Sequence, residues 1–265
     1  MLSYQHLYHA GNPADVHKHA ILAWMLDRLC QKPKPLSYIE THAGRGLYDL
    51  SAAEALKTGE AAAGITRMLG RFATDHPFRQ VVERVRAAHG DTAYPGSPVI
   101  AAEMLRDGDR IHVAELHPQE HEALRDAMRG RGAVWASEGV KVHKADGFEL
   151  AQSICPPEPR RGLMLIDPSF EVKADYDTIP KFMSQINRAW NVGIIALWYP
   201  ILKDARHKGM VRAIETAGLP KVLKSEVSFP PVRPGHGMVG SGMIVVNAPF
   251  GLDDEVKRLA GIIRG

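Results

Sequence analysis

One short stretch, Leu163–Ile166, constrains the fold more than any other part of the chain. Its four apolar residues show no alternation of polar and apolar side chains, which predicts a strand buried on both faces of a parallel sheet. Asp167 follows where the strand must end, because Pro168 has no N–H to donate to a sheet ladder. Open α/β sheets bind ligands at this carboxyl edge, so the sequence places an acid where a site is expected.

The residues after this strand also suit a specific chemistry. The Asp167 carboxylate and the Pro168 backbone carbonyl are two neighbouring acceptors, which suits an amino group with two hydrogens to donate. Phe170 offers a flat face on which a base can stack. The alternative is an ordinary strand end, in which Asp167 and Pro168 begin a loop and Phe170 covers the core. The four residues Asp167–Phe170 alone favour this alternative, so the choice between the two depends on the other predicted strands.

Two further strand ends carry acids. A first strand over 35–40 runs into a glycine-rich turn, where backbone amides can approach a ligand closely, although a lone Gly-x-Gly is equally typical of a tight turn. The second strand, 110–116, carries Glu115, which can accept hydrogen bonds from both ribose hydroxyls of an adenosine cofactor. The third, 140–145, precedes Asp146, which can accept from an adenine amino group. Each acid alone is typical of a turn, but three at successive strand ends indicate a binding edge.

The first half of the chain predicts a single α/β domain, 1–265, with two additions. Asn12 can cap a helix that begins at Pro13 and ends near residue 30. Residues 1–11 show neither helix nor strand pattern and are expected to form an N-terminal arm. Residues 51–94 contain helical stretches and no strand candidate, and we expect them to form a small helical insertion after the first strand.

The second half completes the sheet. After 163–166 the pattern predicts an acidic loop over 171–177, a fifth strand over 193–197, a sixth over 221–228 and, after a long loop, a seventh over 242–246. The last two strands have no helix between them, which predicts an antiparallel hairpin. We therefore expect a seven-stranded, mostly parallel sheet of the α/β class with a C-terminal antiparallel hairpin.

Composition narrows the class of protein. The net charge of +3 permits a polyanionic partner without requiring one. Two distant cysteines, Cys30 and Cys155, argue against a disulfide framework and fit a reducing cytosol. No apolar run approaches the ~20 residues that span a bilayer, so we expect a cytoplasmic protein without membrane contact. His117 and His121 lack an evident third ligand, and we predict no metal site.

Together these features resemble the Rossmann-like class I methyltransferases, which bind S-adenosylmethionine. The segment Asp167–Phe170 is similar to the Asp-Pro-Pro-Tyr motif of methyltransferases that act on adenine amino groups. Longer segments resemble the bacterial RlmJ family of 23S ribosomal RNA adenine-N6 methyltransferases, and the resemblance covers nearly the whole chain. These segments are Leu2–Tyr4, His9–Asn12 with Asp15, Lys18 and His19, Thr41–Gly44, and Tyr94–Pro98.

The resemblance implies methyl transfer from S-adenosylmethionine to the N6 of a specific adenine in 23S ribosomal RNA, supplied as naked RNA or as an assembly intermediate. It implies that Asp167 is the catalytic acceptor and that Tyr4, Pro168 and Phe170 contact the substrate. The positions that match the family's cofactor contacts are His19, His42, Ser97, Glu115, Asp146, Gly147 and Asp167, with Lys18 and Gly44 as further candidates. Ser169 and Phe170 replace the motif's second Pro and its Tyr, but both acceptors remain, so we expect activity to survive. We expect a monomer without an obligate protein partner.

Three other functions fit parts of the sequence. A nicotinamide-dependent oxidoreductase uses a similar nucleotide fold, but Leu47 and Tyr48 follow Gly46 where the Gly-x-Gly-x-x-Gly pattern has its third glycine. An adenine-N6 methyltransferase acting on DNA is a second alternative, because the residues do not show which one reads a 2′-hydroxyl. A non-catalytic RNA-binding module is the third, although three intact strand-end acids argue against a decayed site.

Overall fold

A seven-stranded sheet forms the centre of the computed structural model, which describes residues 5–133, 138–231 and 237–264. The strand order is β5-β4-β1-β6-β7-β9-β8. β9 runs antiparallel to both of its neighbours, and the other adjacent pairs are parallel. The strands are β1 (Ser37–Glu40), β4 (Arg110–Ala114), β5 (Val140–His143), β6 (Gly162–Ile166), β7 (Ile194–Leu202), β8 (Leu223–Ser228) and β9 (Met238–Val246). The predicted mostly parallel sheet with a terminal antiparallel hairpin is confirmed, as is the class I methyltransferase fold.

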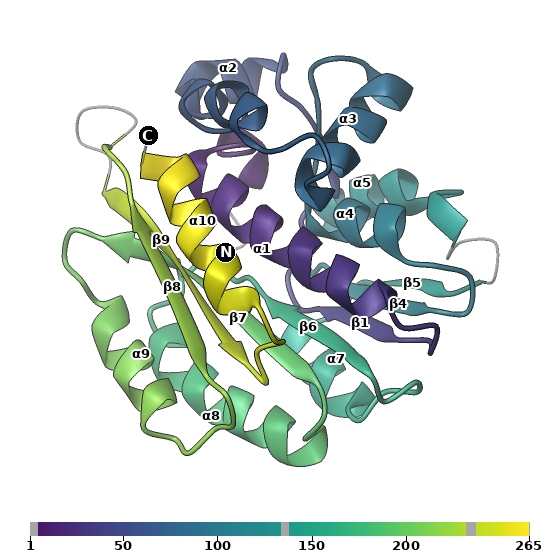
Figure 1. Cartoon of the computed structure of the whole chain (residues 1–265), viewed down its shortest axis with the longest axis vertical. Coiled ribbons are helices and arrows are strands. Elements are labelled where there is room, and N and C mark those ends of the chain that lie inside the picture. Colours follow the sequence, from purple (N-terminus) through teal and green to yellow (C-terminus); the bar gives the residue numbers. More distant parts are fainter. Residues whose placement is uncertain (1–4, 134–137, 232–236, 265) are drawn as a thin grey trace.

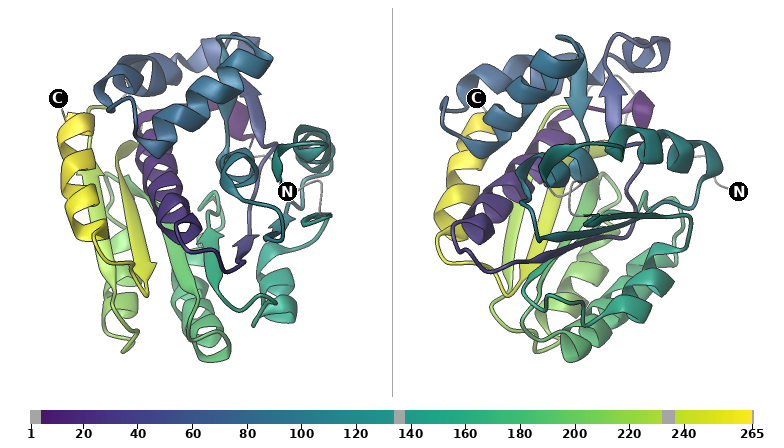
Figure 2. Two further views of the ribbon diagram at one scale, coloured as in Figure 1. Left: turned by 45° about the vertical axis from the view of Figure 1, so that its right-hand side comes forward. Right: turned by 90° about the vertical axis from the view of Figure 1, so that its right-hand side faces the viewer.

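Helices cover both faces of this sheet (Figure 1 and Figure 2). On one face lie α1 (Pro13–Cys30), α4 (Ser97–Met104), α5 (Pro118–Met128) and α10 (Leu252–Arg264). On the other lie α7 (Gly147–Ile154), α8 (Asp175–Ala189) and α9 (His207–Glu215). Within the described parts of the chain, no helix combines the length and the apolar character that crossing a membrane requires.

The central strand β6 is buried on both faces, as its unbroken apolar run predicts. Leu163 and Leu165 are fully buried in the core under α1 and α10, together with Tyr38 of the neighbouring β1. Met164 and Ile166 are equally buried in the core under α8 and α9. Both edges of β6 are also paired, with β1 and β7, so the strand is held rigidly and Asp167 is displayed at its carboxyl end.

The helix α1 begins and ends as the local signals predict. The Asn12 side chain accepts a hydrogen bond from the Asp15 backbone N–H at 2.9 Å, and Pro13 takes the first helical position. The helix ends at Cys30. Because its first two turns point toward the carboxyl edge of the sheet, the cap also sets the position of Lys18 and His19.

The prediction that 51–94 contains no strand is wrong. Ala93–Pro95 form β3, which pairs antiparallel with β2 (Leu47–Asp49) in a separate two-stranded sheet. Three residues are too few to show an alternating pattern, so the pairing is visible only in three dimensions. The helical part consists of α2 (Ala53–Thr58), a π-helical turn (Ala62–Thr66), a 3-10 turn (Leu69–Arg71) and α3 (Pro77–His89), and a further 3-10 turn (His6–Tyr8) precedes α1. The division into arm, insertion and a single domain stays a prediction.

Three boundaries also differ from the predictions. β7 continues to Leu202, because beyond Leu197 it pairs only with β9 and therefore tolerates Pro200 on its other side. Asp175 opens the helix α8 instead of lying in a loop, which places its carboxylate at the positive end of the helix dipole. β9 begins at Met238, inside the predicted loop.

Candidate active site

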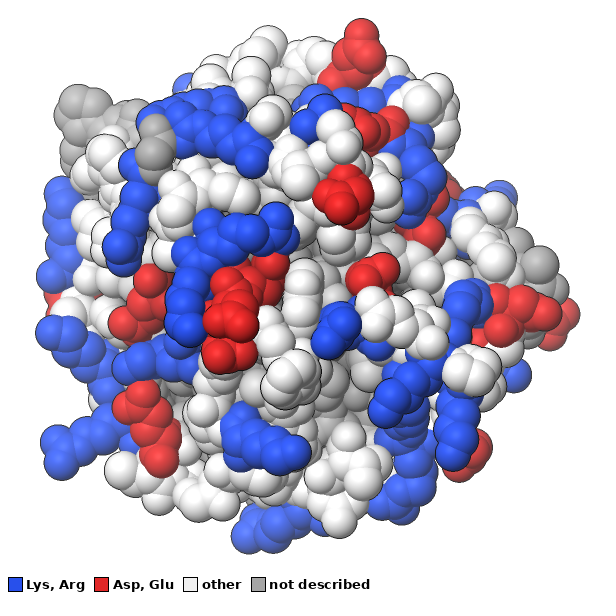
Figure 3. Space-filling model, viewed as in Figure 1, with Lys and Arg blue, Asp and Glu red and all other residues white. Residues whose placement is uncertain are grey.

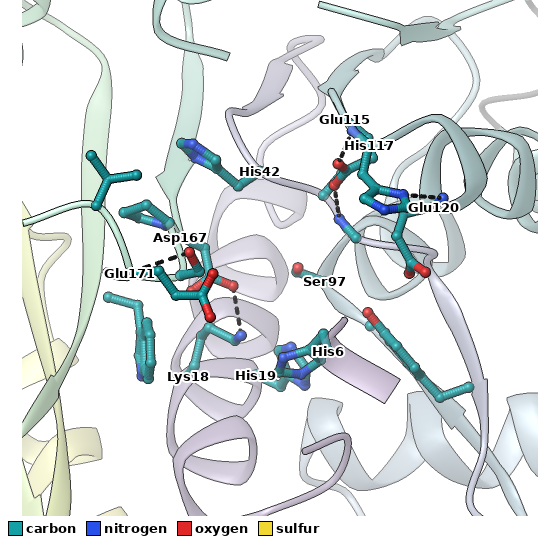
Figure 4. Close-up of a pocket in the computed structure, with 18 residues that line it drawn as sticks. His6, Lys18, His19, His42, Ser97, Glu115, His117, Glu120, Asp167 and Glu171 are labelled. Carbon is teal, nitrogen blue, oxygen red and sulfur yellow. Dashed lines mark hydrogen bonds and ion pairs between the residues drawn. The ribbon is translucent and has the colours of Figure 1, made fainter. Parts of the chain in front are cut away.

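A cavity of about 400 Å³ opens at the carboxyl ends of β1, β4 and β6, which is the edge the sequence predicts. This volume suits a small-molecule ligand. Eight of the predicted site residues line it, namely Lys18, His19, His42, Gly44, Ser97, Glu115, Asp167 and Pro168. In Figure 4, Glu115 and Asp167 approach the cavity from opposite sides, with Ser97 between them.

Asp167 is held by a lysine that is distant in sequence. The Lys18 Nζ donates to Asp167 Oδ2 at 2.6 Å, across a separation of 149 residues. Lys18 is also 3.1 Å from Asp15 Oδ1 and is almost fully buried. Burial disfavours its charge, but the two carboxylates outweigh burial and raise the Lys18 pKa above its ordinary value. The contact occupies one Asp167 oxygen and sets the orientation of the carboxylate.

Asp15 anchors the N-terminal arm to this ion pair. Its Oδ2 lies 2.8 Å from His6 Nε2 and accepts from the Gly11 backbone N–H at 2.9 Å. Burial alone would raise the pKa of Asp15, but His6 and Lys18 together lower it well below the ordinary value. The arm, α1 and the end of β6 therefore meet in one network of hydrogen bonds and ion pairs.

Glu115 is fixed by the backbone on both sides. Its Oε2 accepts from the Gly44 N–H at 2.9 Å and its Oε1 from the His117 N–H at 2.7 Å. Burial raises the pKa of Glu115, while these two hydrogen bonds oppose the shift. Gly44 has a left-handed φ of 61°, and a Cβ there would lie 2.6 Å from the Tyr48 hydroxyl, so the turn favours glycine.

Two histidines of the cavity wall are neutral at physiological pH. Burial lowers the pKa of His19 to about 3 and that of His42 to about 4. His19 Nδ1 lies 2.7 Å from the Tyr94 hydroxyl, and the His42 ring packs edge-on against Phe148 with centroids 5.1 Å apart. Neutral, fixed imidazoles present flat surfaces and single hydrogen-bonding atoms rather than positive charge.

Asp146 and Gly147 do not line the cavity. Asp146 Oδ1 caps α7 by accepting from the Phe148 and Glu149 N–H groups at 2.8 and 3.1 Å. A Cβ on Gly147 would lie 1.8 Å from the Thr41 carbonyl oxygen, so close packing explains this glycine without a ligand. Their predicted cofactor contacts stay predictions.

Phe170 lines a second, smaller cavity of about 160 Å³ beside the first. His6, Ser169 and Trp198 line both cavities. Phe170 is 5% exposed and packs on Tyr176 and Trp198. It therefore contributes to the core and also presents part of its surface to the smaller space. Tyr4 lies outside the described residues.

Known proteins resemble this chain over nearly its full length. The family model described as "Ribosomal RNA large subunit methyltransferase D, RlmJ" matches residues 33–264. The Ribosomal RNA large subunit methyltransferase J of Escherichia coli is 37% identical over 262 residues, which is 98% of this chain and 91% of that protein. Its Haemophilus influenzae counterpart is 37% identical over 263 residues, with 98% and 92% covered. The chain belongs to the RlmJ family.

A solved structure also resembles this RlmJ-family chain over most of its length. A crystal structure of a Legionella pneumophila protein superposes with a TM-score of 0.83 at 31% identity, covering 96% of this chain and 92% of that one. The RlmJ-family chain is a methyltransferase, and the predicted cofactor, S-adenosylmethionine, is confirmed as that of the family. Membership also removes the nicotinamide-dependent oxidoreductase from the alternatives.

Sequence reasoning missed several residues that line the main cavity of this RlmJ-family chain. His6, Trp198 and Glu120 are examples, and Glu120 accepts from the Arg45 guanidinium at 3.0 and 2.7 Å. A signal was present for Trp198, which follows the predicted fifth strand at the same edge as Asp167. His6 and Glu120 lack such a signal, because tertiary contacts with Asp15 and Arg45 place them.

Proposed function

We propose that this methyltransferase transfers a methyl group from S-adenosylmethionine to the exocyclic N6 of a specific adenine in 23S ribosomal RNA. The observation that carries the proposal is the Asp167 carboxylate beside Pro168 in the cavity wall, with one oxygen held by Lys18. We infer that the other Asp167 oxygen, Oδ1, and the Pro168 carbonyl serve as the two acceptors for an amine. The printed names of the relatives support a ribosomal RNA substrate.

The residues of the main cavity fit the methyl donor. When bound, S-adenosylmethionine supplies an electrophilic methyl group on a positively charged sulfur. Glu115, already oriented by two backbone N–H groups, has lone pairs left to accept from ribose hydroxyls. The glycine turn at Gly44 lets the backbone come close to the ligand, and the neutral His19 and His42 contribute walls without repelling a cation.

Asp167 and Pro168 would activate the adenine amine. The nitrogen is a poor nucleophile, because its lone pair is delocalised into the ring. Accepting both N–H hydrogens at Asp167 Oδ1 and the Pro168 carbonyl localises that pair toward the methyl group, and Asp167 then takes the proton that the methylated nitrogen releases. Holding the two reactants in line supplies much of the remaining rate, up to roughly 7–11 kcal/mol in favourable cases.

The target base has to leave its stack to reach Asp167, which costs a few kcal/mol. We infer that Phe170 and Tyr4 stack on it. The second cavity supports this role for Phe170, because His6, Ser169 and Trp198 connect that cavity with the one at Asp167. Stacking on an aromatic side chain is worth about 1–3 kcal/mol per base.

The substrate is proposed to be naked 23S RNA or an assembly intermediate, bound by a monomer in the cytoplasm. On the face shown in Figure 3, Lys and Arg side chains cover parts of α9, α10 and the insertion helices, and acidic side chains lie between them. With a net charge of +3, this distribution suits moderate, salt-dependent attraction to a polyanion.

Methyl transfer to defined nucleic acids tests the proposal. Labelled S-adenosylmethionine is offered with a 23S RNA transcript, DNA of the same sequence and mature large subunits, and modified nucleosides are identified by mass spectrometry. We expect N6-methyladenine in the transcript and a loss in kcat of about 10²- to 10⁴-fold for Asp167→Asn. Asp254→Asn, at a side chain 82% exposed, is the matched control. A different methylated atom, or full activity of Asp167→Asn, would contradict the proposal.

A further inference from the structure

A second acid lies beneath the cavity, where the proposed chemistry does not use it. Glu40 ends β1 and is fully buried. Its Oε2 accepts a hydrogen bond from the Tyr38 hydroxyl at 2.8 Å, and its Oε1 is hydrogen-bonded to the Ser97 hydroxyl. Tyr38 is equally buried, whereas Ser97 lines the cavity. Glu40 therefore touches the ligand site through Ser97.

The surroundings of Glu40 decide its charge. Burial raises its pKa to about 8, although the hydrogen bonds from Ser97 and Tyr38 oppose the shift. The charged groups that face it are the Asp167 carboxylate after β6, which favours the neutral acid, and the Lys18 ammonium of α1, which disfavours it. From its own strand it faces the Tyr38 phenol, whose pKa is raised well above the ordinary value by burial and by Glu40. Burial therefore favours the protonated form of Glu40 near neutral pH.

The location of that proton determines what Ser97 can do. A serine hydroxyl has one hydrogen to donate. An ionised Glu40 would require Ser97 to donate to it, and the Ser97 oxygen would then offer the cavity lone pairs alone. A protonated Glu40 can donate to the Ser97 oxygen instead, which frees the Ser97 hydrogen to point into the cavity.

We propose that Glu40 is a positioning residue that gives its proton to Ser97, so that the Ser97 hydroxyl donates a hydrogen bond to the α-carboxylate of the bound methyl donor. This inference rests on the proposed function, because it takes the amino-acid part of the donor to lie at Ser97. Ser97 lines the same cavity as Glu115 and Asp167 and lies between them (Figure 4), so a donor with its ribose at Glu115 and its sulfur near Asp167 brings its amino-acid chain within the same part of the cavity wall.

Loss of the Glu40 proton reverses the Ser97 hydroxyl and adds a negative charge beneath the carboxylate. Donor binding then requires a proton on Glu40. With a pKa of about 8, such linkage weakens binding by about tenfold between pH 7 and pH 9. The donor's own amino group titrates in the same range, so the effect is measured as a difference between variants.

The test is calorimetric titration of the full chain from pH 6.5 to pH 9 with two ligands. S-adenosylhomocysteine carries the α-carboxylate, and 5′-methylthioadenosine lacks it. Glu40→Gln keeps a donor for Ser97 and an acceptor for Tyr38 but cannot ionise. We expect this variant to bind S-adenosylhomocysteine as the parent does near pH 6.5 and to lose the tenfold weakening at pH 9. We expect Glu40→Ala to bind S-adenosylhomocysteine more weakly than the parent does. The affinity for 5′-methylthioadenosine should depend on pH in the same way in the parent and in Glu40→Gln.

Two results would overturn the proposal. One is a pH dependence for S-adenosylhomocysteine that is the same in Glu40→Gln and in the parent protein, and the other is a Glu40→Gln affinity as low as that of Glu40→Ala. If Glu40→Gln does not fold, Ser97→Ala decides, because it should remove most of the pH dependence that separates the two ligands. Failure of the parent to bind S-adenosylhomocysteine at pH 6.5 would overturn the proposed function itself, whereas binding that does not depend on Glu40 overturns only this inference.

Discussion

Replacing Lys18 by methionine tests the buried charge network most directly. The Lys18 Nζ lies 3.1 Å from Asp15 Oδ1 and 2.6 Å from Asp167 Oδ2. The exposed fractions of the three side chains are 4%, 2% and 12%, so solvent screens these contacts little. Methionine keeps most of the apolar volume and removes the charge, which leaves the buried Asp15 and the half-buried Asp167 without the ammonium between them.

The size of the effect follows from these distances. With an effective dielectric constant of about 20, each contact is worth about 5 to 6 kcal/mol of attraction. Desolvation of the three groups offsets much of this in the parent protein, but it is not recovered for the carboxylates when the lysine is removed. We therefore expect Lys18→Met to lower the free energy of unfolding at pH 7 by about 3–5 kcal/mol.

The loss should depend on pH in a defined direction. The Lys18 pKa is raised above 10.5, so its contribution is present below that pH and is lost only as pH rises past the raised value. The Asp15 pKa is lowered below 3.8, so its contribution is present above that pH and is lost as pH falls through the lowered value. The difference between parent and variant should be full between about pH 5 and pH 9 and should narrow in acid.

Urea unfolding followed by circular dichroism measures this difference. Lys257→Met is the matched control, because that lysine is 72% exposed and lies 3.2 Å from Asp254 on the surface, where an ion pair contributes at most about 1 kcal/mol. Adding Asp167→Asn to Lys18→Met should cost less than the sum of the two single changes, because the second change removes a carboxylate left unpaired. If Lys18→Met destabilises no more than Lys257→Met, the reasoning about the buried network is refuted.

Three further outcomes follow from the same structure. Glu115→Gln should weaken S-adenosylhomocysteine binding about 10- to 100-fold in calorimetry, because hydrogen bonds to charged groups are worth about 1.5–3 kcal/mol. In this variant the amide N–H₂ would face one of the two backbone N–H groups that now donate to Glu115. Unchanged affinity would remove Glu115 from the cofactor site. Gly147→Ala should destabilise the protein by about 1–3 kcal/mol, because its Cβ would lie 1.8 Å from the Thr41 carbonyl oxygen. Gly261→Ala is the control, because outside its own helix backbone and chain neighbours no atom lies within 4 Å of the new Cβ, and it should be neutral or stabilising. Thermal melts of both variants measure the difference, and equal effects would contradict the packing argument. Burial lowers the pKa of His17 from 6.5 to about 3. Between pH 6.5 and pH 3 the histidine is therefore protonated in the unfolded chain and neutral in the folded one. The free energy of unfolding should fall as pH drops through this range, by up to about 1.4 kcal/mol per pH unit. His17→Gln should flatten this slope in urea titrations, and an unaltered slope would assign it to other groups.

Interactions between residues that are close in the sequence made some features of this protein predictable. The apolar run Leu163–Ile166 can be buried only between two layers, and Pro168 ends its ladder, so the position of Asp167 at the sheet edge follows from local residues. Asn12 and Pro13 likewise set the start of α1 within one turn of chain. The acid Glu115 was predictable for the same reason, because parallel strands present their carboxyl ends at one edge.

Tertiary structure alone decided which of these side chains act on one another. Lys18 meets Asp167 across 149 residues, and Glu40 meets Ser97 across 57. The three-residue strands β2 and β3 form only by pairing with each other. The charge state of Glu40, His19 and His42 also depends on burial, which is a property of the packed interior and not of neighbouring residues in the chain. Local sequence therefore determined where the polar groups stand along each element, and long-range packing determined their partners and their protons.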